Sequence, residues 1–256
     1  MALMLLAVDI GNTSTKFGIF DGESLISKFS IPTDPDSTKD DLISAIGQKL
    51  SKTISDAIVC SVVPDANVSL REFLISLGVD EPLFVENDLD FGLKINYEPL
   101  SAMGTDRIVN SFAAVEKYGV PCIVCSFGTA TTFDVVDENR ILLGGIIAPG
   151  MKTMAKALHL NTAKLPEVEI ENPQSVIGNT TVASIQSGIF YGYLAMVEEM
   201  IQRIQNEIGY LSKVIATGGW APVIAENTAQ VDVVDDNLTL EGLSLLYRRL
   251  TSLHIR

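Results

Sequence analysis

The segment from Leu5 to Phe20 constrains the fold of this chain most. An apolar run ends at Asp9, a short Gly-Asn-Thr turn follows, and a second run alternates in polarity. This pattern predicts a strand, a tight loop and a second strand. The pair Asp21-Gly22 predicts a further hairpin turn before residues 25–29. We therefore expect an antiparallel meander in this part of the chain.

The loop between the first two predicted strands carries groups that suit phosphate. Gly11 leaves backbone N–H groups free of side-chain bulk, and Lys16 supplies a cation. Hydroxyl groups are provided by Thr13, Ser14 and Thr15. Such a loop can surround phosphate oxygens. Asp9 stands at its mouth and can hold Mg²⁺ directly or through water, as hard cations prefer.

Composition narrows the class of protein. The chain has 256 residues, of which 47% are hydrophobic, so it can form one large domain or two small ones. A formal net charge of −14 without a basic patch argues against a nucleic-acid-binding protein. Residues 1–8 are apolar but lack a basic region, and Asp9 interrupts them, so a signal peptide is not expected. We expect a cytoplasmic protein.

The cysteines fit the same compartment. Cys60, Cys122 and Cys125 are an odd, small set, which is typical of a reducing cytosol without structural disulfides. Cys122 and Cys125 form a C-x-x-C motif, for which a redox or zinc role is the alternative. The pair lies in an apolar run typical of a buried strand, where residues three apart point to opposite faces. We therefore interpret these cysteines as small buried hydrophobic residues.

The rest of the chain alternates between strand and helix patterns, which predicts an α/β fold. Helices are expected over residues 39–52, 68–77, 106–118, 181–207 and 240–250. Further strands are expected over 57–63, 82–85, 141–148, 214–216 and 231–234, with a strand–glycine turn–strand unit over 122–136.

That unit resembles the first hairpin. Overlaying Gly11 on Gly128 without an insertion places Thr15 on Thr132 and Asp9 on Ser126. Two ordinary hairpins of one sheet are the alternative, but the shared order of elements favours a duplication. We expect domains over residues 1–117 and 118–256, packed together.

Three glycine-containing loops each follow an apolar strand, and the third is Thr217-Gly218-Gly219. One such loop is more often a plain turn. Two matched phosphate-type hairpins and a late Gly-Gly corner indicate a nucleotide cleft between two related halves. The set contains neither a Walker P-loop nor a dinucleotide-binding fingerprint.

Gly104-Thr105-Asp106-Arg107 precedes a predicted helix and can carry chemistry. Asp106 can accept a proton from a substrate hydroxyl, and Arg107 can neutralise an anionic substrate or a transferring phosphoryl group. The alternative is that Asp106 caps the helix and that Arg107 is a solvated surface charge.

These motifs together resemble the type III pantothenate kinases, of the acetate and sugar kinase, Hsp70 and actin superfamily. The resemblance rests on Asp9–Lys16, Gly104–Arg107, Phe127–Asp134, Ile147–Met151 and Ala216–Gly219 in this order, and it covers essentially the whole chain. It implies two ribonuclease-H-like (actin-like ATPase) domains with mixed sheets flanked by helices. It also implies ATP-dependent phosphorylation of pantothenate, the first step of coenzyme A synthesis, by a homodimer that uses Mg²⁺ and a monovalent cation, K⁺ or NH₄⁺.

Site residues follow from the same resemblance. The ATP phosphates are expected to be lined by Asp9, Ile10, Gly11, Asn12, Thr13, Ser14, Thr15, Lys16 and Thr129. Pantothenate is expected to contact Tyr97, Gly104, Thr105, Asp106, Arg107 and Thr181, with Asp106 as the catalytic proton acceptor. For Thr181 a helix N-cap is the alternative.

One position departs from the family pattern. The family carries Asp, a ligand of the monovalent cation, where this chain has Ser126. A neutral hydroxyl is a poorer ligand for a hard cation than a carboxylate. The departure motivates a second hypothesis, a catalytically weak paralogue that binds nucleotide or pantothenate and has a regulatory role. A kinase for another small hydroxy acid or sugar is the third, against which Tyr97 and the intact Gly104–Arg107 motif argue.

Overall fold

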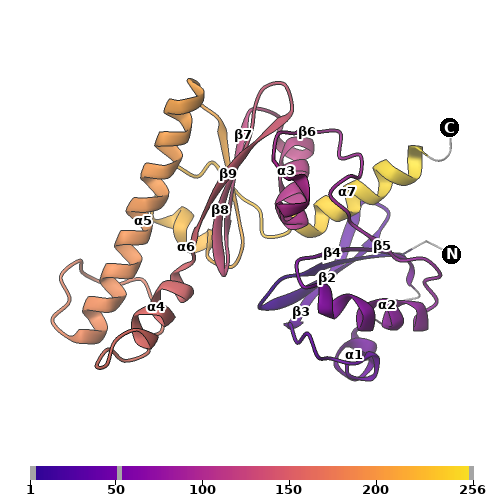
Figure 1. Cartoon of the computed structure of the whole chain (residues 1–256), viewed down its shortest axis with the longest axis horizontal. Coiled ribbons are helices and arrows are strands. Elements are labelled where there is room, and N and C mark those ends of the chain that lie inside the picture. The colour runs from indigo at the N-terminus through magenta and orange to yellow at the C-terminus, as the bar shows by residue number, and fades with distance from the viewer. Residues whose placement is uncertain (1–3, 51–53, 254–256) are drawn as a thin grey trace. The chain divides into compact units, whose positions relative to one another are not determined.

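The computed structural model describes residues 4–50 and 54–253, which form two compact units (Figure 1). Unit 1 contains the chain up to Lys117 and from Asn237 onward, and unit 2 contains Tyr118–Asp236. The prediction that all residues after 117 belong to the second domain therefore fails for the last segment.

The reason lies in helix α7 (Leu238–Leu253), which packs on strands of unit 1. Its buried Leu243 and Leu246 are apolar, and polar contacts fix it in place. Thr239 Oγ1 donates to Asn110 Oδ1 at 2.8 Å, and Tyr247 Oη donates to Asp56 Oδ1 at 2.6 Å. Every residue of strand β1 (Met4–Ile10) is buried, so both faces of the sheet are covered there, and α7 supplies part of one cover.

Unit 1 is built on a five-stranded mixed sheet in the order β3-β2-β1-β4-β5. The strands are β1 (Met4–Ile10), β2 (Ser14–Asp21), β3 (Ser24–Pro32), β4 (Ile54–Ser61) and β5 (Leu83–Phe84). The predicted meander is confirmed, since β1, β2 and β3 pair antiparallel, whereas β4 runs parallel to β1. The further elements are α1 (Lys39–Ile46), α2 (Asn67–Ser76), β6 (Lys94–Ile95), α3 (Thr105–Tyr118) and 3₁₀ turns at Gly47–Lys49, Pro64–Ala66 and Leu100–Ala102.

Helix α1 is shorter than the predicted helix over 39–52. It begins after Thr38, which forms a capping box with Asp41, and it ends at Ile46. Gly47, a weak helix former, opens a 3₁₀ turn. Residues 51–52 of the prediction lie outside the described residues.

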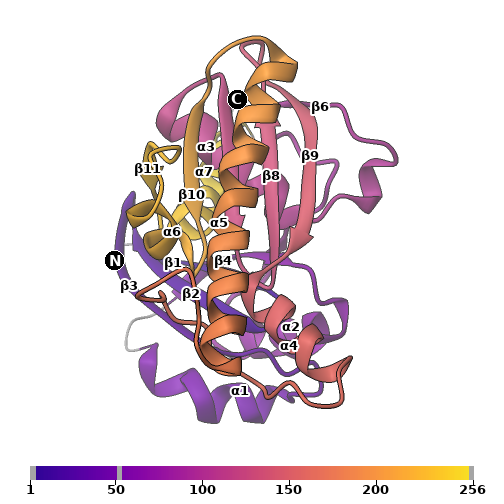
Figure 2. The ribbon, with the colours of Figure 1, turned by 90° about the vertical axis from the view of Figure 1, so that its left-hand side faces the viewer.

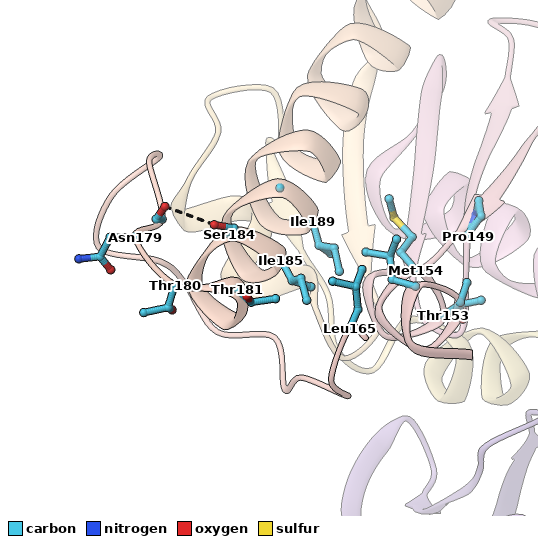
Figure 3. A pocket seen from close by; sticks show the side chains of 14 residues that line it. Pro149, Thr153, Met154, Leu165, Asn179, Thr180, Thr181, Ser184, Ile185 and Ile189 are labelled. Atoms are coloured by element: carbon cyan, nitrogen blue, oxygen red, sulfur yellow. Dashed lines mark hydrogen bonds between the residues drawn. The ribbon is translucent and has the colours of Figure 1, made fainter. Parts of the chain in front are cut away.

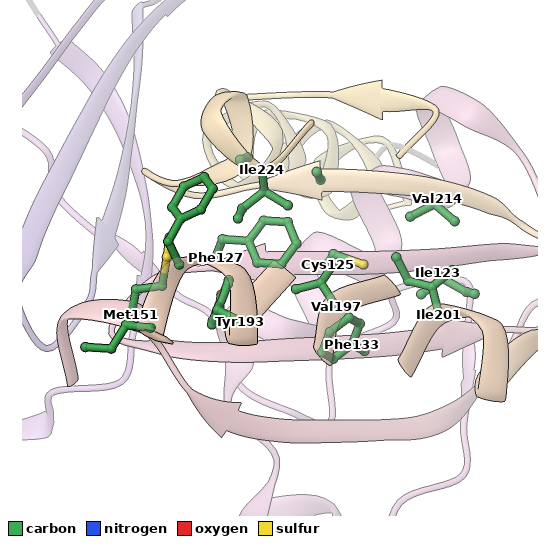
Figure 4. Packing of buried hydrophobic residues seen from close by; sticks show 14 of the residues in the cluster. Ile123, Cys125, Phe127, Phe133, Met151, Tyr193, Val197, Ile201, Val214 and Ile224 are labelled. Carbon is green, nitrogen blue, oxygen red and sulfur yellow. The ribbon is translucent and has the colours of Figure 1, made fainter. Parts of the chain in front are cut away.

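Unit 2 repeats the same strand order. Its strands are β7 (Cys122–Phe127), β8 (Ala130–Val136), β9 (Ile141–Pro149), β10 (Lys213–Thr217) and β11 (Val233–Val234), arranged as β11-β10-β7-β8-β9. Its helices are α4 (Met151–Leu160), α5 (Thr181–Ile208) and α6 (Ala221–Glu226). Helix α5 runs across one face of this sheet (Figure 2). Figure 4 shows the core beneath it, where Phe127, Phe133, Tyr193 and Val197 pack together.

The two hairpins differ in the length of their turns. Strand pairing places Ile10 opposite Thr15 but Phe127 opposite Thr131. The second turn is thus one residue shorter, because Gly11 N donates to Ser14 O whereas Gly128 N donates to Ala130 O. Thr15 therefore corresponds to Thr131 and Lys16 to Thr132, and the overlay without an insertion is wrong beyond the turn.

The three cysteines are free and buried, as predicted. Cys125 belongs to the core that faces α5, which fits the interpretation as a small apolar residue. Within residues 4–50 and 54–253, no helix is both long enough and apolar enough to cross a membrane.

Candidate active site

The first loop of unit 1 is held by a neighbouring strand end. Thr33, just after β3, donates its backbone N–H to Thr13 O at 3.1 Å and its hydroxyl to Gly11 O at 2.7 Å. The Thr15 hydroxyl lies 2.9 Å from that of Thr33 and is buried. Asn12 and Thr13 are exposed at the tip. The loop is thus preshaped, with Thr15 turned toward the protein and the tip open to a ligand.

A charged pair stands at the base of this loop. Lys16 Nζ lies 3.4 Å from Asp9 Oδ2 on the neighbouring strand. Asp9 is only 7% exposed. Its burial raises its pKa above the ordinary value, the charge of Lys16 lowers the pKa, and the charge of Asp106 raises it further. Asp9, Lys16 and Asp106 therefore interact electrostatically within one unit.

The predicted Gly104–Arg107 motif forms the first turn of α3. Arg107 N donates to Asp106 Oδ1 at 2.9 Å. Burial is the main cause that raises the pKa of Asp106, against the backbone hydrogen bond and the charge of Arg107. Arg107 is only 6% exposed, and its guanidinium lies 5.6 Å from the ring centroid of Tyr97. The interpretation of Arg107 as a solvated surface charge is therefore wrong.

A pocket of about 390 Å³ opens beside this motif, wholly within unit 1. Its walls come from the end of β4, the start of α2, and residues 84–87 and 101–105. Asn87 Nδ2 fixes one wall, because it donates to Leu100 O at 2.6 Å and to Met103 O at 2.8 Å. Asn67 Oδ1 is buried and has no hydrogen-bond partner among the described residues. An unpaired buried acceptor suits a ligand that donates a hydrogen bond.

The second unit replaces the charged pair with hydroxyls. Asp9 faces Lys16 on one side and Cys60 on the other, and the equivalent Ser126 faces Thr132 and Thr217. Residues directly opposite in a sheet share a face, so the three hydroxyl residues form a row. Thr132 Oγ1 is buried and has no partner among the described residues.

The second loop is supported by the turn that starts α4 and by the Gly-Gly corner. Gly150 N and Thr153 Oγ1 donate to Thr129 O at 3.1 and 2.7 Å. Gly218 has φ +93°, and a Cβ there would lie 2.6 Å from Phe127 O. Only glycine fits that corner, because both the conformation and the close approach exclude a side chain.

Thr181 lines a different feature, the α4–α5 groove of about 1100 Å³ (Figure 3). The alternative that Thr181 is the N-cap of α5 is wrong, because Thr180 occupies that position and accepts a hydrogen bond from Ala183 N at 3.1 Å. Thr181 is the first helical residue and is exposed.

The predicted site residues therefore fall into two sets. Unit 1 contains Asp9–Lys16, Tyr97 and Gly104–Arg107, and unit 2 contains Thr129 and Thr181. Sequence reasoning missed Thr33 and Asn67. Neither has a motif around it, since each reaches the site through the strand order or the start of a helix.

The residues of the candidate site offer few ligands for a metal ion. Within residues 4–50 and 54–253, no group of three or more His, Cys, Asp or Glu side chains could hold a metal. Mg²⁺ in kinases usually takes one or two carboxylates and completes its shell with phosphates and water. The buried carboxylate of Asp9 can supply one such ligand.

Comparison with known proteins shows the family of this chain. The family model described as type III pantothenate kinase matches residues 5–203. A type III pantothenate kinase from Agathobacter rectalis is 42% identical over 253 residues, covering 96% of this chain and 97% of that protein. One from Dehalococcoides mccartyi is 41% identical over 254 residues and covers 97% and 98%.

Among solved structures, the inorganic polyphosphate/ATP-glucomannokinase from an Arthrobacter species superposes with a TM-score of 0.52 at 14% identity, covering 96% and 99% of the two chains. This likeness shows the fold alone, and it confirms the expected actin-like arrangement of two mixed sheets flanked by helices. Motifs, strand order and overall sequence similarity thus agree, and the chain belongs to the type III pantothenate kinase family.

Proposed function

We propose that this chain transfers the γ-phosphoryl group of ATP to the primary hydroxyl of pantothenate with Asp106 as the proton acceptor. Family membership makes it a pantothenate kinase of coenzyme A biosynthesis. The observation that supports the residue roles is the group of Asp9, Lys16 and Asp106 beside a preshaped glycine loop. Phosphoryl transfer needs mainly positioning and charge stabilisation, which such a group supplies.

Asp106 suits the role of proton acceptor. Its burial raises the pKa of the carboxyl toward the range where a general base works well near neutral pH. The backbone N–H of Arg107 holds one carboxylate oxygen and orients the group. As pantothenate loses its hydroxyl proton to Asp106, its oxygen bonds to the γ-phosphorus while the bond from that phosphorus to the β,γ-bridging oxygen breaks, and ADP leaves with that oxygen.

The phosphates are assigned to the loop Gly11–Lys16. Its exposed tip offers backbone N–H groups, and Lys16 supplies positive charge toward the phosphoryl oxygens. Asp9 would hold Mg²⁺, which when bound neutralises phosphate charge. Thr129 and the Gly218–Gly219 corner would contribute the remaining ATP contacts, and their joint contact with one ATP molecule stays a prediction.

Pantothenate is assigned to the pocket beside Gly104 and Thr105. Pantothenate carries one amide, two hydroxyls and one carboxylate. Arg107 and Tyr97 suit the carboxylate or the developing phosphoryl charge, because the guanidinium is a buried, fixed cation. Asn67 Oδ1 suits a hydroxyl or amide hydrogen.

The monovalent cation is assigned to the row of Ser126, Thr132 and Thr217. The unpartnered Thr132 Oγ1 supports this, since hydroxyl oxygens can coordinate K⁺ or NH₄⁺. Without a carboxylate the row is neutral, so we expect weaker binding than at an Asp-containing site. The chain would then depend only mildly on K⁺.

A homodimer is the proposed assembly. Two large apolar side chains lie within two residues, in sequence, of the groove-lining Leu158 and Gly178: Leu160 is 68% and Ile177 87% exposed, and we call this pair the apolar rim of the groove. Patches of this kind mark association surfaces. The free buried cysteines fit a reducing compartment, and we place the enzyme in the cytoplasm.

Steady-state assays of ADP release with pantothenate as the acceptor test the proposal. Asp106→Asn should lower kcat by roughly 10²–10⁴-fold, the usual contribution of a general base. Pantothenate-dependent turnover of the parent separates the kinase from the regulatory paralogue, which would bind ligand without turnover. Pantoate and simple sugars as alternative acceptors test the remaining hypothesis.

A further inference from the structure

The buried thiol of Cys60 lies close enough to the carboxylates of Asp9 and Asp106 to be affected by the charge of each. Strand pairing places Cys60 of β4 directly beside Asp9 of β1, and Cys60 has no exposed surface. Its Sγ lies 3.2 Å from Thr105 Oγ1, in the residue that precedes Asp106. The same thiol is therefore adjacent to the proposed phosphate side and to the proposed base.

The Thr105 hydroxyl points toward β4. It donates to Ser61 O at 3.3 Å, so the Cys60 thiol is the group that donates to Thr105 Oγ1. This gives a chain from Cys60 S–H through Thr105 O–H to the Ser61 carbonyl. Thr105 also lines the pocket assigned to pantothenate, and its expected contact with that substrate stays a prediction.

The chain of hydrogen bonds acts on Asp106 through the first turn of α3. Thr105 is the first residue of that helix, so fixing its side chain fixes where the helix starts. A Cβ at Gly104 would lie 2.5 Å from Asp106 Oδ1, which shows how tightly the carboxylate folds back over Gly104. In such a confined turn, a small shift of Thr105 moves the carboxylate.

We infer that Cys60 is a positioning residue, which holds the carboxylate of Asp106 in place for proton transfer through its hydrogen bond to Thr105. This rests on the proposed role of Asp106. Burial is the main cause that raises the pKa of Cys60 well above its ordinary value, and the charges of Asp9 and Asp106 raise it further. The proposal itself rests on the two hydrogen bonds of Thr105, to the Cys60 thiol and to the Ser61 carbonyl.

The test compares Cys60→Ala, Cys60→Ser and Thr105→Ala in the full-length enzyme. Cys122→Ala is the matched control, since it removes a fully buried thiol from unit 2. We expect Cys60→Ala and Thr105→Ala to lower kcat by about 5- to 50-fold, within the roughly 10²-fold that a misplaced group can cause. In Cys60→Ala the KM values for pantothenate and ATP should stay within about twofold, because the thiol has no exposed surface that could contact a ligand.

Cys60→Ser should recover most of kcat, because its hydroxyl can donate to Thr105. The double variant Cys60→Ala/Thr105→Ala should be no slower than Thr105→Ala, because both changes break one chain. A parent-like kcat in Cys60→Ala, or no rescue by serine, overturns the inference. The fraction of folded molecules is measured by calorimetric titration with a non-hydrolysable ATP analogue. A loss of kcat that disappears after correction for this fraction also overturns the inference.

Asp106→Asn belongs in the same series. A parent-like kcat in that variant overturns the proton-acceptor role itself, together with the inference. A large loss in Asp106→Asn with a parent-like Cys60→Ala overturns the inference alone.

Discussion

Lys16 Nζ lies 3.4 Å from Asp9 Oδ2 across the β1–β2 ladder. The equivalent positions of unit 2 carry Ser126 and Thr132, which are neutral. The two hairpins thus share the antiparallel pairing of their strands but differ in turn length and in charge. We therefore expect the first hairpin to supply most of the electrostatic stabilisation of the ATP phosphates.

Lys16→Met should therefore weaken ATP use. A hydrogen bond to a charged group contributes about 1.5–3 kcal/mol, so we expect the KM for ATP to rise by roughly 10- to 100-fold. The KM for pantothenate should change little. Steady-state assays with either substrate varied measure both values. Lys39→Met removes a half-buried cation at the start of α1 and serves as the control, and equal effects of the two changes would contradict the assignment.

The sequence predicted the strands and helices well where periodicity was strong. The long helix over 181–207 and the two hairpins are examples. It failed at α7, because an amphipathic pattern shows that a face is buried but not which sheet buries it. It also failed at the second turn, because a one-residue shortening leaves no mark in a short overlay.

The proposed site residues also divide into those with a local sequence signal and those without one. Asp9, Gly11 and Asp106 can be proposed from the sequence because they stand in compact motifs at strand or helix ends. Cys60 and Asn67 cannot, since only strand pairing and the start of a helix bring them to the proposed site. Contacts between residues 45 positions apart, as for Cys60 and Thr105, have no local signal.

Ser126→Asp should increase K⁺ dependence. A carboxylate is a harder ligand than a hydroxyl, so the new side chain should bind the cation more strongly. We expect the ratio of rates in K⁺ and in choline to be higher than in the parent, and ADP release in the two salts measures it. Ser126→Ala is the control, which should lower the ratio further. Equal ratios in all three proteins would show that this row does not bind the cation.

Asp106→Asn should stabilise the protein at neutral pH. The folded pKa of Asp106 is raised above 3.8, mainly by burial, so the native state binds the proton more tightly than the unfolded chain. Stability contributed by the protonated form is lost as pH rises through the folded pKa. The amide removes this loss, and we expect the Tm at pH 7.5 to rise by about 2–4 °C, equivalent to about 1 kcal/mol.

The difference in Tm between this variant and the parent should shrink as pH falls toward 4. Differential scanning calorimetry from pH 4 to pH 8 measures it. Asp65→Asn on an exposed turn is the control and should show no such trend. A Tm advantage that grows on acidification would have the opposite sign and would contradict the pKa direction.

Ile177→Asp should disrupt the proposed dimer. Ile177 is 87% exposed, so the change should not disturb the fold but should place a charge on the apolar rim of the α4–α5 groove. Light scattering after size exclusion should give the monomer mass at low micromolar concentration. Leu211→Asp is the matched control, because Leu211 is 83% exposed and far along unit 2 in sequence. An unchanged dimer in Ile177→Asp, or a monomeric parent, would reject this surface.

Asn67→Ala should weaken pantothenate binding without changing ATP binding. The buried Oδ1 of Asn67 has no partner among the described residues, and a donor on pantothenate would satisfy it. Losing one neutral hydrogen bond costs about 0.5–1.5 kcal/mol, so the KM for pantothenate should rise by roughly 2- to 10-fold.

Two pantothenate analogues identify the group that donates to Asn67: one lacks the secondary hydroxyl, and the other is methylated on the amide nitrogen. The analogue that has lost the donor should bind the parent and Asn67→Ala equally well. Asn172→Ala, an exposed amide of unit 2, controls for nonspecific effects. If Asn67→Ala leaves the KM for pantothenate unchanged while both analogues still lose affinity, the donor is bound elsewhere in the pocket.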